Sequence, residues 1–271
     1  MKPAPFEYHA PDSVDDAVGL LAEHGDDAKP LAGGQSLVPM LALRLARFDH
    51  LVDLNRVDGL RGVQRADGML RVGAMTTQAT VERDDAVARD VPLLAAATPL
   101  IGHFQIRNRG TVGGNLGTAS PAGDALPPLL AEGALVDVAS VRGVRTLPLD
   151  EFLLGVKRNA LEPDELVTAV RLAPSGGPQT FMKVGPRNAM VIAICSLAVI
   201  VDAAAGEVRA SFGSAATTAR RVTVPLAEAA ALPERVADAA APIDDVRATA
   251  AYRRHSLRVL ASRALERCLR S

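Results

Sequence analysis

The chain has 271 residues, which is long enough for a hydrophobic core and for more than one domain. Its 30 basic and 31 acidic residues give a formal net charge of −1, without the basic excess that non-specific nucleic-acid binding requires. Hydrophobic residues make up 48% of the chain, yet no run approaches the roughly 20 apolar residues of a membrane span.

Two further features of the sequence bear on compartment and metal content. The first residues lack the basic and apolar pattern of a signal peptide, so we expect a cytoplasmic protein with no membrane span and no nucleic-acid partner. The two cysteines, Cys195 and Cys268, form no CxxC or Cys/His set, and we expect no metal site in this chain. Cys195 ends an apolar run over residues 191–195 and is expected to be a buried thiol.

The first predicted segment covers residues 1–57 and has the order of a βαβ unit. Ser13 is expected to cap a helix, because two aspartates follow in its first turn, and Gly25 is expected to end it. A short strand then leads into a glycine turn, a helix-like stretch over 39–46 and a strand over 51–54.

The glycine turn of this segment has features of an anion site. Two adjacent glycines allow positive φ, and successive backbone N–H groups can form a nest for a phosphate. Ser36 is expected to cap the helix that follows. The alternative is a plain strand-to-helix turn that binds nothing. The turn consists of Leu31, Ala32, Gly33, Gly34, Gln35, Ser36 and Leu37.

The second predicted segment covers residues 58–174, with strands over 70–74, 134–138 and 165–172 and helices over 77–84 and 91–97. Its most polar and glycine-rich stretch, residues 101–124, contains a glycine turn over 110–120, which is interpreted as a loop whose small donors suit a diphosphate. It matches neither GxGxxG followed by a ribose-binding acid nor GxxxxGK[ST], so neither a Rossmann site nor a P-loop is supported. An ordinary glycine loop is the alternative.

The third predicted segment, residues 178–271, follows a linker at Ser175–Pro178. Strand-like runs cover residues 179–184 and 192–202. An arginine-rich amphipathic helix is predicted over 244–270.

Taken together, these stretches resemble the FAD-binding medium subunit of molybdenum hydroxylases, such as the medium subunits of aerobic carbon monoxide dehydrogenases and the flavin domain of xanthine dehydrogenases. The resemblance covers essentially the whole chain in order. The residues that carry it most clearly are Ala32–Leu37, Gln105–Asn115, Thr118–Pro121 and Asp124. It implies an α+β protein, with a two-part FAD-binding fold of the PCMH/vanillyl-alcohol-oxidase type (1–57 and 58–174) followed by a C-terminal sheet-and-helix domain (178–271).

The resemblance also implies which residues contact FAD. The backbone of residues 32–36 and 111–115 would hold the diphosphate, Asp124 the flavin–ribityl region, and Lys183 would lie near the flavin ring, with Ile101 and Val167 along its apolar faces. Attachment is expected to be non-covalent, because neither glycine stretch contains His, Cys or Tyr. No catalytic side chain is expected. The full expected set is Leu31, Ala32, Gly33, Gly34, Gln35, Ser36, Leu37, Ile101, Thr111, Val112, Gly113, Gly114, Asn115, Thr118, Asp124, Val167 and Lys183.

Several of these residues have simpler interpretations. Asp124 is also placed to cap the helix that begins near Pro127, and Lys183 to be a solvated strand lysine. Arg107 and Arg109 would either steer a phosphate or pair with acids.

The function that the resemblance implies is electron transfer. FAD would collect electrons from a small iron–sulphur subunit, which receives them from a large molybdenum-cofactor subunit, and would pass them to an external acceptor; a dimer of such heterotrimers is one assembly it allows. Two alternatives remain open. A self-sufficient oxidoreductase of the vanillyl-alcohol-oxidase fold would need a substrate domain, and residues 178–271 contain only one His and one Tyr. A non-enzymatic nucleotide-binding module would need neither.

Overall fold

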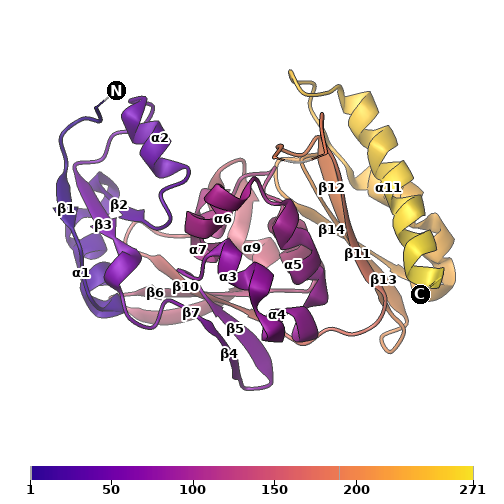
Figure 1. Ribbon diagram of the computed structural model, residues 1–271, viewed down its shortest axis with the longest axis horizontal. Coiled ribbons are helices and arrows are strands. Elements are labelled where there is room, and N and C mark those ends of the chain that lie inside the picture. The colour runs from indigo at the N-terminus through magenta and orange to yellow at the C-terminus, as the bar shows by residue number, and fades with distance from the viewer. Residues whose placement is uncertain (1, 189, 271) are drawn as a thin grey trace.

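The computed structural model describes residues 2–188 and 190–270. Three parts follow one another along the molecule, each built on its own sheet (Figure 1). The N-terminal part is drawn in indigo at the left, and the long C-terminal helix in yellow at the right. The combination of separate helices with parallel and antiparallel sheets confirms the α+β class. Each sheet lies inside one predicted segment, while the division into domains stays a prediction. No helix in the described ranges is long and apolar enough to cross a membrane.

The first part is a three-stranded parallel sheet with strand order β1-β3-β2. Its elements are β1 (Glu7–His9), α1 (Val14–His24), β2 (Ala28–Leu31), α2 (Leu37–Ala42) and β3 (His50–Asp53). The predicted helix signals are confirmed: Ser13 accepts a hydrogen bond from the Asp16 N–H at 3.0 Å, and Gly25 ends the helix at φ +51°. The predicted strand–turn–helix–strand unit is present as β2-α2-β3, with the two strands parallel.

The second part is a five-stranded antiparallel sheet with strand order β4-β5-β10-β6-β7, next to a group of short helices. Its strands are β4 (Val63–Ala66), β5 (Met69–Gly73), β6 (Leu135–Ser140), β7 (Gly143–Pro148) and β10 (Leu166–Leu172), with a small hairpin of β8 (Leu153–Gly155) and β9 (Arg158–Asn159). Its helices are α3 (Gln78–Arg83), α4 (Asp85–Asp90), α5 (Pro92–Ala97), α6 (Phe104–Arg109), α7 (Val112–Thr118), α8 (Leu126–Ala131) and α9 (Leu149–Phe152).

The third part is a four-stranded antiparallel meander covered by two helices. Its elements are β11 (Gln179–Val184), β12 (Cys195–Asp202), β13 (Glu207–Gly213), β14 (Arg220–Pro225), α10 (Leu232–Ala239) and α11 (Ala250–Arg270). Alternate residues of β12 point to different cores: Leu197 and Val199 pack with α11, whereas Ala198 and Ile200 pack with α5 and α8 of the second part. A strand buried on both faces explains the continuous apolar run in the sequence.

Two predictions for this part need correction. The sequence indicated two strands, but β13 and β14 complete the sheet; polar residues such as Arg220 and Arg221 on the exposed edge strand masked its pattern. The C-terminal helix begins at Ala250 rather than near Asp244, because residues 244–249 form a hydrogen-bonded loop ahead of it. Cys195 is fully buried as predicted, and burial raises the pKa of its thiol to about 12.

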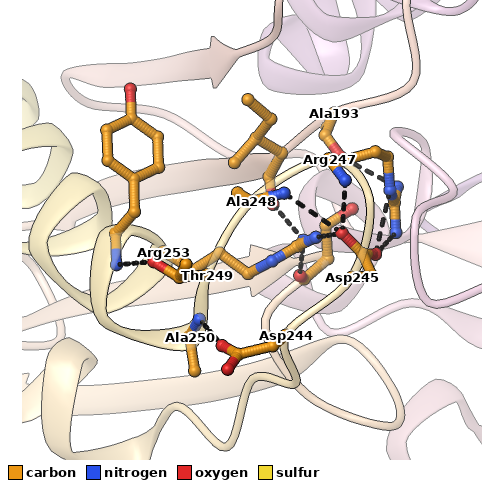
Figure 2. Close-up of polar contacts among 11 residues, drawn as sticks. Ala193, Asp244, Asp245, Arg247, Ala248, Thr249, Ala250 and Arg253 are labelled. Carbon is orange, nitrogen blue, oxygen red and sulfur yellow. Dashed lines mark hydrogen bonds and ion pairs between the residues drawn. The ribbon is translucent and has the colours of Figure 1, made fainter.

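The loop before α11 is tied to the sheet by a buried arginine (Figure 2). The carboxylate of Asp245 lies between the guanidinium groups of Arg247 and Arg253, at 2.7 and 2.6 Å. The Arg247 guanidinium, with backbone N–H groups and Arg253, holds the pKa of Asp245 well below its usual range. Arg253 is only 1% exposed and also donates to the carbonyl oxygens of Ile194 and Ser214. These bonds connect the start of β12, the end of β13 and α11.

Candidate cofactor site

The first glycine turn joins β2 to α2 and leaves its backbone donors free. Gly34 has φ +73°, a conformation that favours glycine. None of the backbone N–H groups of residues 33–36 donates a hydrogen bond to any residue in the described ranges. The turn holds itself through the Gln35 side-chain amide, which donates to the Gly33 carbonyl at 3.0 Å. Consecutive free N–H groups around a positive-φ glycine are the arrangement that binds phosphate oxygens in backbone nests.

The predicted capping role of Ser36 is wrong. Ser36 precedes α2, but its side chain makes no capping hydrogen bond and its backbone is already in the helical region, at φ −105° and ψ −47°. A capping residue needs an extended backbone to turn its side chain towards the first N–H groups of the helix. The Val38 N–H donates instead to the Gly34 carbonyl at 3.0 Å, and Pro39 has no N–H for a cap to accept.

The second glycine stretch is a helix and not the loop that the sequence predicted. Residues 112–118 form α7, capped by Thr111, whose hydroxyl accepts the Gly114 N–H at 3.1 Å. The N–H groups of Val112 and Gly113 donate to the carbonyls of Thr76 and Ala74 at 3.0 and 2.8 Å. Glycine is a poor helix former, so its density indicated a loop. Close packing of α7 requires glycine at this position, because a Cβ on Gly113 would lie 2.6 Å from the Ala74 Cβ.

The structure brings the two glycine stretches into direct contact. Gly33 is buried, and a Cβ there would lie 2.0 Å from the carbonyl oxygen of Arg109, just ahead of α7. A Cβ on Gly114 would lie 3.5 Å from that of Ala32. Asn55 donates to the Ala32 carbonyl at 3.4 Å and so connects the turn to the end of β3. Asn55 was not among the predicted site residues, although it lies only two residues after the end of β3.

Asp124 and Lys183 form a buried ion pair between the second and third parts. The Lys183 Nζ lies 2.6 Å from Asp124 Oδ2 and also donates to the Leu100 carbonyl at 2.9 Å. Both side chains are almost fully buried, at 6% and 9% exposure. Burial raises the pKa of Asp124, while Lys183 opposes the rise. Asp124 Oδ1 is buried without a hydrogen-bond partner among the described residues, which leaves one acceptor for a ligand.

The simpler interpretations of these two residues are both wrong. The residue at the N-cap of α8 is Ala125, without a side-chain cap, because the Asp124 carboxylate is turned towards Lys183. Lys183 is buried and paired, whereas a solvated strand lysine would extend into water. Their predicted contacts with the flavin stay a prediction.

The other expected residues differ in how they relate to the two glycine stretches and to the Asp124–Lys183 pair. Ile101 and Val167 are 8% and 4% exposed and belong to the same hydrophobic core beside α7. Asn115 is half-buried, with its Oδ1 3.1 Å from where a Cβ of Gly123 would be, next to Asp124. Thr118 donates to the Gly114 carbonyl within α7. Arg107 is bonded to Glu82 at 2.8 Å, so it pairs with an acid.

Comparison with known proteins identifies the family. Residues 4–174 match the FAD binding domain in molybdopterin dehydrogenase. The chain is 34% identical to the 6-hydroxypseudooxynicotine dehydrogenase complex subunit alpha of Paenarthrobacter nicotinovorans, over 99% of this chain and 96% of that one. It is 36% identical to the carbon monoxide dehydrogenase medium chain of Afipia carboxidovorans, over 98% of each. A chain of the solved carbon monoxide dehydrogenase from Hydrogenophaga pseudoflava matches with a TM-score of 0.92 and 33% identity, over 99% of each chain.

These matches include both glycine stretches and extend through the third part of the molecule. They confirm the predicted fold, in which an FAD-binding region is followed by a C-terminal sheet-and-helix domain. The chain belongs to the FAD-binding medium subunits of the molybdenum hydroxylase family and is an FAD-dependent oxidoreductase subunit of the carbon monoxide dehydrogenase and xanthine dehydrogenase type.

Proposed function

We propose that this chain is the electron-transfer subunit of a heterotrimeric molybdenum hydroxylase. In this assembly a large subunit carries the molybdenum cofactor, and a small subunit passes electrons through iron–sulphur clusters to FAD on this chain. An external acceptor then receives them. The observation that carries the proposal is the full-length similarity to proteins named as a complex subunit and as a medium chain.

The free donors and acceptors of the site fit FAD. The diphosphate would lie against residues 32–36, where the N–H groups of residues 33–36 are unused, and residues 111–115 would adjoin it. Asp124 Oδ1 would accept a hydrogen bond from the ribityl or flavin region. Lys183 would place a positive charge near the flavin ring and favour its negatively charged reduced form. When bound, FAD supplies the ability to take electrons singly and release them as a pair; the chain supplies position and charge.

The surface offers apolar side chains that suit protein contacts. Leu43 and Leu45, which follow α2, are 54% and 73% exposed, and Phe104 at the start of α6 is 60% exposed. Exposed large apolar residues close to a binding site are common where another protein docks. We infer that partner subunits cover part of this surface.

The first alternative is a self-sufficient flavin oxidoreductase. That enzyme would oxidise its substrate alone, so isolated chain and assembly would have the same activity. The second alternative, a nucleotide-binding module without redox function, would bind adenine nucleotides and show no flavin reduction. The full-length similarity to dehydrogenase subunits supports the electron-transfer subunit and neither of these two alternatives.

The test compares the isolated chain with the assembly. Acid precipitation of the purified chain should release FAD into the supernatant, because its attachment is non-covalent. Dithionite should reduce the flavin, and a quinone dye or oxygen should reoxidise it. Purines, aldehydes, aromatic heterocycles and carbon monoxide should leave the isolated chain unchanged. Turnover should appear only after co-expression with an iron–sulphur subunit and a molybdenum subunit, in a complex that contains both metals. Turnover by the isolated, metal-free chain would contradict the proposal.

A further inference from the structure

Three of the five histidines gather on one face of the N-terminal sheet, away from the candidate cofactor site. His9 ends β1, His24 ends α1 and His50 begins β3. One ring nitrogen from each lies within 4.8 Å of the other two. The residues are far apart in the sequence and have none of the short spacings that mark a metal motif, so sequence analysis did not single them out.

The register of the sheet explains why the side chains meet. Strands β1 and β3 are parallel, with Glu7 opposite His50 and His9 opposite Val52. Because side chains alternate along a strand, Glu7, His9 and His50 share one face with Val52. Val52 packs in the same core as α1, so this is the face that the helix covers. The helix ends at His24, over the same face of the sheet, and all three histidines are half-buried.

The contacts among these side chains leave ring nitrogens for a ligand. His9 Nε2 lies 3.1 Å from His50 Nδ1, and the Glu7 carboxylate lies 3.5 Å from the same nitrogen. The rings of His24 and His50 are stacked, with centroids 3.7 Å apart and planes 5° from parallel. The lone pairs of stacked rings lie in two parallel planes and cannot converge on one ion, so an ion would draw His24 out of the stack. Its position at the helix end makes this a side-chain rotation.

We propose that His9, His24 and His50 bind one divalent transition-metal ion, with Glu7 as a fourth ligand. Imidazole nitrogen suits Zn²⁺, Cu²⁺ and Ni²⁺, and four N and O ligands match tetrahedral Zn²⁺. A tetrahedral Zn²⁺ binds imidazole nitrogen at about 2.0–2.1 Å, which sets its ligand nitrogens roughly 3.4 Å apart. His9 Nε2 and His50 Nδ1 are already this close, at 3.1 Å, so the approach to the ion falls to His24. This proposal departs from the expectation of no metal site in this chain, which rested on the absence of a CxxC or Cys/His set.

Such an ion would act as a structural link. β1 has only three residues and is an edge strand that, among the described residues, pairs with β3 alone. An ion held by β1, α1 and β3 would bind the folded first part and not the unfolded chain, so it would raise the melting temperature.

The experiment uses the flavin-containing chain without an affinity tag, treated with EDTA and then titrated with Zn²⁺ by calorimetry. We expect one ion per chain and a higher melting temperature with Zn²⁺. His24→Gln and His50→Gln should each weaken binding by about tenfold or more. His255→Gln is the matched control: His255 is exposed on α11, outside the cluster, and its loss should change nothing. Flavin absorbance and circular dichroism establish that each variant is folded.

A second measurement does not depend on the variants. Cu²⁺ added to the wild-type chain should give an electron paramagnetic resonance spectrum with hyperfine splitting from imidazole nitrogen. Three outcomes would overturn the proposal: no saturable Zn²⁺ binding by the wild-type chain, unchanged binding by both histidine variants, or a Cu²⁺ spectrum without nitrogen splitting. Binding without any rise in melting temperature would overturn the structural role.

Discussion

Gly114 and Gly117 lie in the same short helix but have different surroundings. A Cβ on Gly114 would lie 2.8 Å from the Thr111 hydroxyl that caps α7, whereas a Cβ on Gly117 would meet nothing within 4 Å. Gly114→Ala should therefore disturb the cap, at a cost of about 1 kcal/mol, and weaken FAD binding about tenfold or more. Gly117→Ala should stabilise the protein by about 0.5–1 kcal/mol and retain FAD. Flavin occupancy and urea unfolding measure both effects. Full FAD occupancy in Gly114→Ala would show that the backbone of α7 at Gly114 does not shape the FAD site.

The Asp124–Lys183 pair makes a second prediction at the residue scale. Removing one partner leaves the other charge buried, so Asp124→Asn or Lys183→Met alone should cost about 3–5 kcal/mol. The double variant should recover much of this loss, because no unpaired charge remains. Urea unfolding of the four proteins gives the coupling energy. Additive losses in the double variant would contradict the importance of the pair.

The pH dependence of this pair has a definite sign. Burial raises the pKa of Asp124 in the folded state. The contribution of Asp124 to stability is therefore largest at low pH and is lost as the pH rises through this folded-state pKa. Lys183 limits the rise, and Lys183→Met should therefore shift the pKa further upward. The Lys183→Met protein should therefore lose less stability relative to wild type in acid than at neutral pH.

At the scale of elements, Glu132 connects the end of α8 to the linker before β11. It is 6% exposed and accepts a hydrogen bond from the Ser175 hydroxyl at 2.9 Å. Burial raises its pKa from 4.5 to about 7. Between these values the unfolded chain has released the proton and the folded chain keeps it, so stability should fall by about 3 kcal/mol as pH rises from 4.5 to 7. Unfolding midpoints at pH 5 and 8 should differ less in Glu132→Gln, and an unchanged difference would refute the assignment.

Helix α11 provides a matched pair of arginines. Arg253 is buried and donates to two backbone carbonyls and to Asp245, whereas its neighbour Arg254 is exposed and makes one bond of 3.4 Å to the Ala240 carbonyl. Arg253→Met leaves buried carbonyls without a donor and should cost about 3–5 kcal/mol. Arg254→Met should change stability by less than about 0.5 kcal/mol. Chemical unfolding distinguishes the two, and equal effects would mean that the network in Figure 2 contributes nothing.

The elements also show what the sequence could predict. Local signals were sufficient for α1, because its cap, first-turn acids and terminal glycine lie next to one another in the chain. They failed for α7, where the fit of Gly113 against Ala74 outweighs the low helix propensity of glycine. They also failed for β13 and β14; β14 is the exposed edge strand and carries Arg220 and Arg221, which obscure an alternating apolar pattern.

The same contrast between local sequence signals and tertiary packing applies to the candidate site. The glycine stretches were found because a backbone that approaches another group needs glycine, and Gly33 does press on the Arg109 carbonyl. The Asp124–Lys183 pair could not be derived from local pattern, because it joins a residue just before α8 to a residue of β11, which only the fold brings together. The resemblance implied a role for each of these two residues but did not imply that they contact each other.

At the scale of the whole molecule, FAD is expected to fasten the first part to the second. Their contact at the site consists of the turn at residues 32–36 against the segment at 109–114. A ligand that binds only this joined form stabilises it by about 2.7 kcal/mol at a hundred times its dissociation constant. The FAD-bound chain should therefore melt at a higher temperature than the same chain after reversible removal of FAD.

Hydrogen exchange can show which glycine stretch takes the diphosphate. The N–H groups of residues 33–36 donate to nothing in the described ranges, so without FAD they should exchange quickly. Those of residues 112–115 already donate within the chain. FAD should therefore slow exchange strongly at 33–36 and little at 112–115. The Gly114→Ala protein at the same FAD concentration is the control and should show weaker protection at 33–36. Protection confined to 112–115 would mean that the N–H groups of α7 turn to the ligand on binding, and that the free turn is not the phosphate site.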